Sequence, residues 1–193
     1  MKRWLLIIAA VLSLTGCGYN DFQRLDEASK AAWSEVVNQY QRRADLIPNL
    51  VATVKGYAAH EKETLEGVVQ ARAHATGIQV TPEMLKDPAA FEQFQKAQAG
   101  LTSALGRLIA IAENYPNLKA DQNFRDLQSQ LEGTENRITV ARKRYIDRVA
   151  EYNKRVRYFP TNLTAKFILH LDERPNFSVA DEKAVAKPPE VKF

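Results

Sequence analysis

The chain has 193 residues, of which 45% are hydrophobic and 26% charged, and its formal net charge is +4 at pH 7. This length and composition suit one domain with a substantial hydrophobic core. The chain contains a single cysteine, which excludes a framework of intramolecular disulfides. Secondary structure and side-chain packing must therefore supply the stability.

The first 20 residues are typical of a bacterial lipoprotein signal. Lys2 and Arg3 form a positive n-region, residues 4–14 form an apolar segment, and Leu14-Thr15-Gly16-Cys17 matches a lipobox. We expect residues 1–16 to be removed as a signal peptide, so that Cys17 becomes the first mature residue and carries S-diacylglycerol and an N-acyl chain such as palmitate. Residues 17–20 then form a lipidated tether, and two or three acyl chains hold a protein stably on a bilayer.

Two other interpretations of this segment stay open. An uncleaved transmembrane helix needs about 20 apolar residues, and this segment is shorter than that before Asn20 and Asp21. A plain secretory signal leaves Cys17 without a role. Cleavage removes Lys2 and Arg3, so the formal net charge falls from +4 to +2. A charge this close to balance does not indicate any particular class of partner. Gly18 as the second mature residue predicts the periplasmic face of the outer membrane in a Gram-negative host, and the extracytoplasmic face of the cell membrane otherwise.

Residues 25–72 carry apolar side chains in steps of three and four, which predicts a long helix. Pro48 lies inside this pattern, and a proline there removes the hydrogen bond to the carbonyl of Ala44. Because the pattern passes through Pro48 unbroken, we favour a kinked but continuous helix from Asp21 to Ala75. The alternative is a hairpin at Leu46-Ile47-Pro48, which gives a compact bundle of four more equal helices.

Residues 76–87 contain Gly77 and predict a loop with one short turn that begins at Thr81-Pro82. A second apolar pattern follows from Phe91 to Tyr115. Asp87-Pro88 supplies its N-cap and first helical residue, and Pro116 ends it.

A third apolar pattern predicts a helix from Asp121 to Tyr158. Between Arg137 and Arg157 it carries eight basic residues against two acidic ones. A solvated helix face is the simpler interpretation, and a surface for an anionic partner is the functional one. Because the protein is expected to be exported from the cytoplasm, nucleic acid is not the expected partner of this basic surface. An anionic lipid headgroup, a cell-wall polymer or an acidic protein face fits better. The candidate residues are Arg142, Lys143, Arg144, Arg148, Lys154 and Arg155.

The remaining chain predicts a short apolar element at residues 160–171 and a disordered tail at residues 172–193, rich in Asp, Glu, Lys, Ala and Pro. Residues 21–171 are therefore predicted to form an all-α domain. Its architecture is an antiparallel up-and-down bundle of three to four long helices, with the first helix kinked or broken at Pro48.

Several local sequences resemble the LemA family. They are Arg42-Arg43-Ala44-Asp45-Leu46-Ile47-Pro48-Asn49-Leu50, Asn114-Tyr115-Pro116-Asn117-Leu118-Lys119-Ala120, Glu132-Gly133-Thr134-Glu135-Asn136-Arg137-Ile138, and Phe159-Pro160 through Arg174-Pro175. The resemblance covers nearly the whole mature chain. It implies an antiparallel helical bundle on the outer side of a bacterial membrane, usually anchored by an N-terminal transmembrane helix that lipidation replaces here. It implies no established activity. Relatives are often encoded near TPM-domain or HtpX-like membrane proteins, which hints at an adaptor role.

No sequence pattern indicates catalysis, a metal or a cofactor. A zinc-protease helix needs a second histidine four residues after His60, and that position is Thr64. His74 lies about 21 Å further along a helix, too far to share a metal with His60. Ser34 has no plausible base nearby. We therefore expect a non-enzymatic scaffold or adaptor of the cell envelope, and the alternative is an envelope protein that binds an anionic lipid or wall polymer through its basic face.

Charged residues on or beside the apolar patterns predict ion pairs between helices, because a charge at such a position is costly unless it is paired. These residues are Glu61, Arg72, Arg107, Glu113, Glu135 and Arg142.

Overall fold

The structure is a computed structural model that describes the backbone of residues 2–177 and the side chains of residues 18–177. This part of the chain is helical and contains no strand, so the all-α prediction is confirmed. The elements in order are α1 (Lys2–Tyr57), α2 (Lys62–Gly77), η1 (Pro82–Lys86), α3 (Pro88–Ala112), α4 (Pro116–Ala120), α5 (Gln122–Arg157), α6 (Thr161–Leu163) and η2 (Thr164–Leu169).

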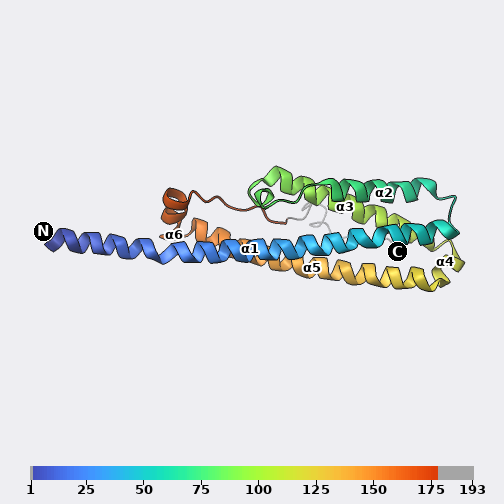
Figure 1. Cartoon of the computed structure of the whole chain (residues 1–193), viewed down its shortest axis with the longest axis horizontal. Helices are drawn as coiled ribbons and strands as arrows, with labels where there is room; N and C mark the ends of the chain where they lie inside the picture. Colours follow the sequence, from blue (N-terminus) through green and yellow to red (C-terminus); the bar gives the residue numbers. More distant parts are fainter. Residues whose placement is uncertain (1, 178–193) are drawn as a thin grey trace, which may run out of the picture.

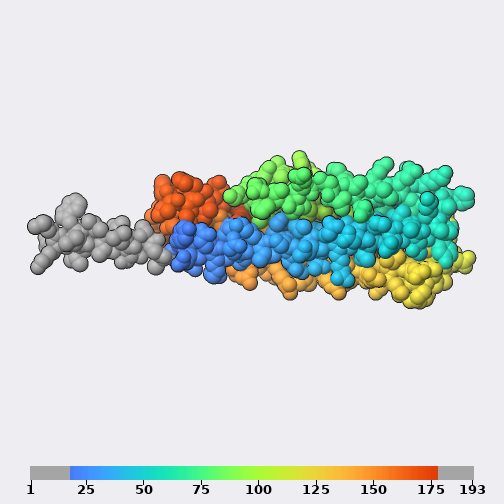
Figure 2. Space-filling model, in the orientation of Figure 1, coloured from blue at the N-terminus to red at the C-terminus, as the bar shows by residue number. Residues whose placement is uncertain are grey.

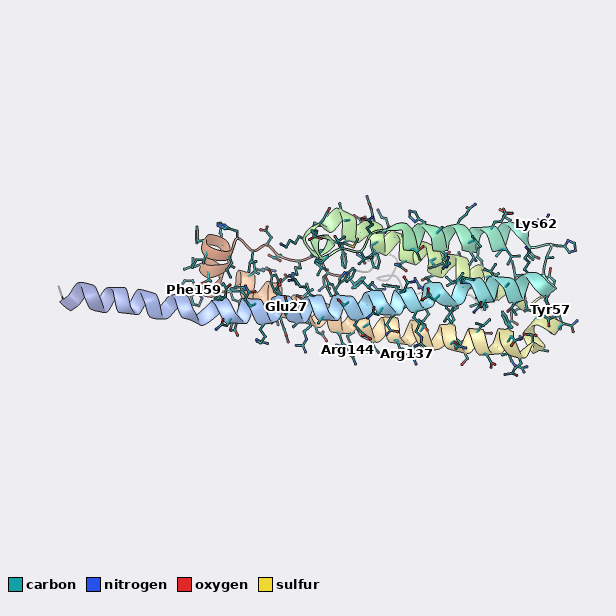
Figure 3. All side chains as sticks on the ribbon, viewed as in Figure 1. Glu27, Tyr57, Lys62, Arg137, Arg144 and Phe159 are labelled. Carbon is teal, nitrogen blue, oxygen red and sulfur yellow. The ribbon has the colours of Figure 1, made fainter. Side chains whose placement is uncertain are left out.

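The long helices lie side by side in a rod (Figure 1). Helix α1 runs the length of the rod, and α5 returns along it from the opposite end. Helices α2 and α3 form a second pair along the C-terminal part of α1. The N-terminal part of α1 extends beyond the other helices, so we call that end the proximal end and the end at Tyr57 and Lys62 the distal end (Figure 3).

Helix α1 contains Pro48 and continues to Tyr57, so the chain does not form the alternative hairpin at residues 46–48. The predicted continuation to Ala75 is wrong, because the chain turns after Tyr57 and begins α2 at Lys62. At this corner the Ala58 N–H bonds the Val54 carbonyl at 2.8 Å, and Ala58 is fully buried. Ala58 and Leu65 are seven residues apart and both buried, so the apolar pattern keeps its phase across the corner.

The predicted boundaries of α3 and α5 are confirmed within a few residues. The Asp87 carboxylate accepts hydrogen bonds from the N–H groups of Ala89 and Ala90, and Asp121 caps α5 by accepting from Phe124. Such caps satisfy N–H groups that the first helical turn leaves unpaired. The predicted turn at residues 81–82 is the start of η1.

The core consists of three clusters along the rod. A distal cluster joins α1, α2, α3 and α5, and an aromatic cluster at mid-length has Trp33 at its centre, with ring centroids of Phe94 and Tyr145 both 5.3 Å away. A small proximal cluster contains Phe22, Leu25, Tyr152 and Ala165.

Residues 172–177, which we call the strap, pack against α1 and α5 and so differ from the predicted disorder of residues 172–193. Arg174 is only 6% exposed and forms an ion pair with Asp26. Phe177 packs on Trp33 with a centroid distance of 6.2 Å. The rest of the predicted tail, residues 178–193, lies outside the described residues.

Candidate functional site

Among side chains 18–177, no group of three or more His, Cys, Asp or Glu residues is placed to hold a metal ion. His60 and His74 are both exposed. The Glu61 carboxylate accepts a hydrogen bond from the Tyr115 hydroxyl at 3.1 Å, so it belongs to the packing of the distal corner.

Two hollows of about 190 and 240 Å³ lie on the rod. The first is lined mostly by apolar side chains together with Tyr40, Thr76 and Gln98. The second lies between α1 and α5 beside Glu35, Arg137 and Arg144. Ligand pockets typically measure about 300–1,000 Å³, so these hollows are small for a ligand site.

The side chain of Cys17, the candidate lipidation residue, lies outside the described residues, and the description of side chains begins at the next residue, Gly18. Gly18 is buried, and a Cβ there would lie 3.7 Å from the side chains of both Thr161 and Thr164. The chain therefore leaves Cys17 directly beside the α6–η2 segment, at the proximal end.

The candidate basic residues of α5 do not form one free surface. Lys143 pairs with Asp147 at 2.9 Å, Arg148 with Glu151 at 3.1 Å, and Arg155 with Asp21 of α1. These contacts neutralise half of the predicted set within the protein.

The other three candidate residues have different surroundings. Arg142 is partly buried, with its guanidinium 4.3 Å from the centroid of the Phe177 ring in the strap. Arg144 and Lys154 are exposed and have no ion-pair partner among the described residues. Arg144 borders the hollow between α1 and α5 together with Arg137, and both labelled side chains come from the middle of α5 (Figure 3).

The most buried charge is one that the sequence analysis did not single out. Arg43 of α1 is 1% exposed and donates to Glu135 of α5 and to Thr102 of α3, both at 2.9 Å. Its other terminal nitrogen donates to the Gln98 side chain at 2.6 Å. One guanidinium thus joins three helices, and the Tyr40 ring lies 5.0 Å from it. The sequence contained one signal of this burial: Arg43 lies three residues after Tyr40, and residues at that spacing share one face of a helix.

The predicted ion pairs between helices are found for Glu135, through Arg43, whereas Arg72 has a different role. The Arg72 Nε–H of α2 donates to the Ala44 carbonyl of α1 at 2.8 Å. This is the carbonyl that Pro48 cannot bond, because proline has no N–H. The family-like sequence around Pro48 therefore packs against a donor from the neighbouring helix.

The remaining predicted charges make local contacts. Glu113 pairs with Lys119 at the distal corner, and Arg107 donates to Ser103 within α3 at 3.1 Å. These contacts do not join separate long helices.

The strap is the other contact that the sequence analysis missed. The Arg174 guanidinium donates to Ser29 and Asp26 of α1 and lies 4.4 Å from the Tyr152 ring centroid. Tyr145 donates to the Pro175 carbonyl at 3.0 Å. Burial raises the pKa of Tyr145, so its hydroxyl stays a neutral donor near neutral pH.

These features lie in a region that a family model recognises: the model of the LemA family matches residues 32–193. The chain belongs to the LemA family. The earlier resemblance is thereby confirmed, and the match includes Arg43, Pro48, Arg72 and the strap.

LemA-family membership is accompanied by a more distant similarity to magnetosome proteins. The chain is 26% identical over 176 residues to magnetosome proteins MamQ 1 and MamQ 2 of Paramagnetospirillum magneticum strain AMB-1, a match that covers 83% of this chain and 65% of each relative. It is 26% identical over 198 residues to magnetosome protein MamQ of Magnetospirillum gryphiswaldense strain MSR-1, covering 89% of this chain and 73% of the relative. The chain thus spans about two thirds of the length of the first two relatives.

Family membership and these relatives indicate a membrane-associated helical protein. Among the residues whose side chains the structure describes, no helix is both long enough and apolar enough to cross a membrane.

Proposed function

We propose that the mature protein is a non-enzymatic lipoprotein of the bacterial envelope that acts as a helical scaffold or adaptor. The observation that carries the proposal is the continuity of α1. From Gly18, the residue after the proposed lipidation site, α1 continues without interruption to Tyr57 at the distal end. From Gly18 to Tyr57 such a helix is about 60 Å long at 1.5 Å per residue. An anchor at residue 17 therefore holds a rod that extends well away from its membrane.

The shape of the molecule supports contacts with another protein. The described residues form an elongated surface of long helices with small hollows, and the distal corner exposes Tyr57 and Lys62 far from the proximal end (Figure 3). The partner in this proposal is an envelope or membrane protein, with the TPM-domain and HtpX-like classes as first candidates. The proposed location is the periplasmic face of the outer membrane in a Gram-negative host, and the extracytoplasmic face of the cell membrane otherwise.

Metabolic labelling with an alkyne fatty acid tests the anchor. We predict that the wild type incorporates the label and that Cys17→Ala abolishes incorporation, leaving uncleaved precursor at the membrane, because a lipoprotein peptidase acts only on the diacylglyceryl-modified cysteine. Arg42→Ala is a suitable control, since it changes an exposed residue of the same helix. Equal labelling of the wild type and Cys17→Ala would rule out lipidation at this residue.

A second candidate function is binding of an anionic lipid headgroup by the basic side of α5. The observation in its favour is that Arg137 and Arg144 are exposed and flank one hollow. Binding to vesicles containing phosphatidylglycerol should then weaken strongly with salt and with Arg137→Gln plus Arg144→Gln. The matched control is Lys143→Gln plus Arg148→Gln on the same helix, where both cations are already paired. Equal effects of the two pairs would exclude this site.

A further inference from the structure

Exposed apolar side chains concentrate at the proximal end of the rod. Six of the nine large hydrophobic residues that are exposed among the described residues belong to this end, and we call them the proximal apolar face. They are Tyr19, Tyr158, Phe159, Leu163, Phe167 and Ile168, with exposed fractions from 48% to 79%. The other three, Tyr57, Val69 and Val140, lie singly on other helices. Single exposed apolar residues are ordinary, whereas a cluster marks an interaction surface.

The segment that carries this face is held firmly on the bundle by its opposite side. Ala165 is 1% exposed and packs in one cluster with Phe22 of α1 and Tyr152 of α5. The Thr161 hydroxyl lies 2.8 Å from the carbonyl oxygens of both Arg155 and Tyr158, which share its one hydrogen. The outward aromatic side chains therefore project from an ordered support.

The proximal end is also where the chain enters from its anchor. Gly18 lies in contact distance of Thr161 and Thr164, and Cys17 precedes it by one residue. In the space-filling view the segment that contains α6 and η2 lies directly beside the first described residues of α1 (Figure 2). Lipid attached at residue 17, or an uncleaved helix ending there, brings a bilayer to this level of the rod.

The chemistry of this end suits a bilayer interface. Aromatic side chains are enriched at the boundary between headgroups and acyl chains, and lysine and arginine beside them reach the anionic headgroups. Lys166 lies 5.9 Å from the Phe167 ring centroid, and Lys154 is exposed. Of the nearby acids, Asp21 and Glu173 are paired with Arg155 and Arg157, and Asp172 is exposed.

We propose that the proximal apolar face docks into the headgroup region of the bilayer to which the N-terminal segment attaches the protein. This contact gives the rod a second point of attachment beside residue 17, and so restricts its tilt. The inference rests on the proposed function only in requiring that the N-terminal segment hold the protein at a membrane.

Depth-dependent quenching tests the contact on the full, membrane-attached chain. Because Cys17 is the only native cysteine and is consumed by lipid in this account, Phe159→Cys and Phe167→Cys each introduce one free thiol for a polarity-sensitive fluorophore. Val69→Cys on α2 is the matched control, since Val69 is also apolar and 51% exposed, and it lies away from the hollow beside Arg137 and Arg144. The protein is placed in vesicles of phosphatidylethanolamine and phosphatidylglycerol that carry nitroxide-labelled acyl chains.

We expect the fluorophores at positions 159 and 167 to shift to the blue and lose most of their emission to the nitroxide, while the fluorophore at position 69 stays unquenched. Membrane-attached protein in which all three fluorophores remain in water would overturn the docking proposal alone. Protein that fails to attach to the vesicles at all would instead overturn the membrane anchor, and with it the proposed function.

Discussion

The Ala44 carbonyl lacks its helical donor because Pro48 carries no N–H, and Arg72 of the next helix supplies one at 2.8 Å. A buried carbonyl without a donor costs about 1–3 kcal/mol, and a hydrogen bond from a charged donor contributes roughly 1.5–3 kcal/mol. The proline is therefore tolerated with help from α2. Its removal restores a backbone N–H that can take over the role of Arg72.

Because Pro48 and Arg72 are linked through the Ala44 carbonyl, their substitutions should not be additive. Arg72→Ala should lower the free energy of unfolding by about 1–2 kcal/mol in the wild type, and by clearly less in the Pro48→Ala background. Pro48→Ala alone should be tolerated or stabilising. Urea unfolding followed by circular dichroism measures all four proteins. An Arg72→Ala cost that is the same in both backgrounds would show that the two residues are not coupled through Ala44.

Arg43 is the second residue on which the bundle depends. Removing its side chain leaves the polar groups of Gln98, Thr102 and Glu135 without their shared donor, so Arg43→Ala should cost about 3 kcal/mol of unfolding free energy. Arg42→Ala removes the exposed neighbour and should stay within about 0.5 kcal/mol of the wild type. Chemical denaturation of both variants distinguishes them. Equal losses would mean that the buried network contributes little.

At the scale of elements, the continuity of α1 through Pro48 has a direct geometric consequence. Spin labels at the exposed residues Asn38 and Lys55 are separated by 17 residues of helix, which places the two backbones about 25 Å apart. A hairpin at residues 46–48 would return them to roughly 10–15 Å. Pulsed electron resonance on the doubly labelled protein measures this distance, and a short value would contradict the continuous helix.

The helix boundaries that were predictable from the sequence are those marked by local chemistry. Asp87 and Asp121 each mark a helix start by accepting hydrogen bonds from N–H groups two or three residues later, and Pro88 marks the first helical position because its ring fixes φ. These signals are local, so they can be recognised without tertiary information. The corner after Tyr57 was missed because Ala58 and Leu65 keep the apolar phase through it. A pattern in phase looks continuous even where the chain reverses.

The interaction surfaces were less predictable because they depend on long-range partners. Arg174 lies in a polar segment, and its burial requires Asp26 and Ser29 from nearly 150 residues earlier. The basic residues of α5 were counted as a sum, although the spacing of Lys143 to Asp147 already allows an ion pair within the helix. Residues 160–171 were predictable only as a short apolar element, because the sequence does not tell which side of a short helix meets the bundle and which side is left exposed.

At the scale of the whole molecule, the described residues form a rod with chemically different ends. The proximal end has exposed aromatic and aliphatic side chains beside the anchor that we propose at residue 17, whereas the distal end is a corner between α1 and α2 that is about 60 Å further along α1. An adaptor built this way separates membrane attachment from partner binding. The long seam between α1 and α5 joins the two ends (Figure 1).

The height of the distal end above the bilayer tests this account most directly. A donor fluorophore on Lys62→Cys, in membrane-attached protein with headgroup-linked acceptor dyes, should show weak energy transfer consistent with a height of about 60 Å. The same donor on Phe159→Cys should show strong transfer. Strong transfer from both positions would mean that the rod lies along the membrane, and would contradict the account of a scaffold that reaches outward from its anchor.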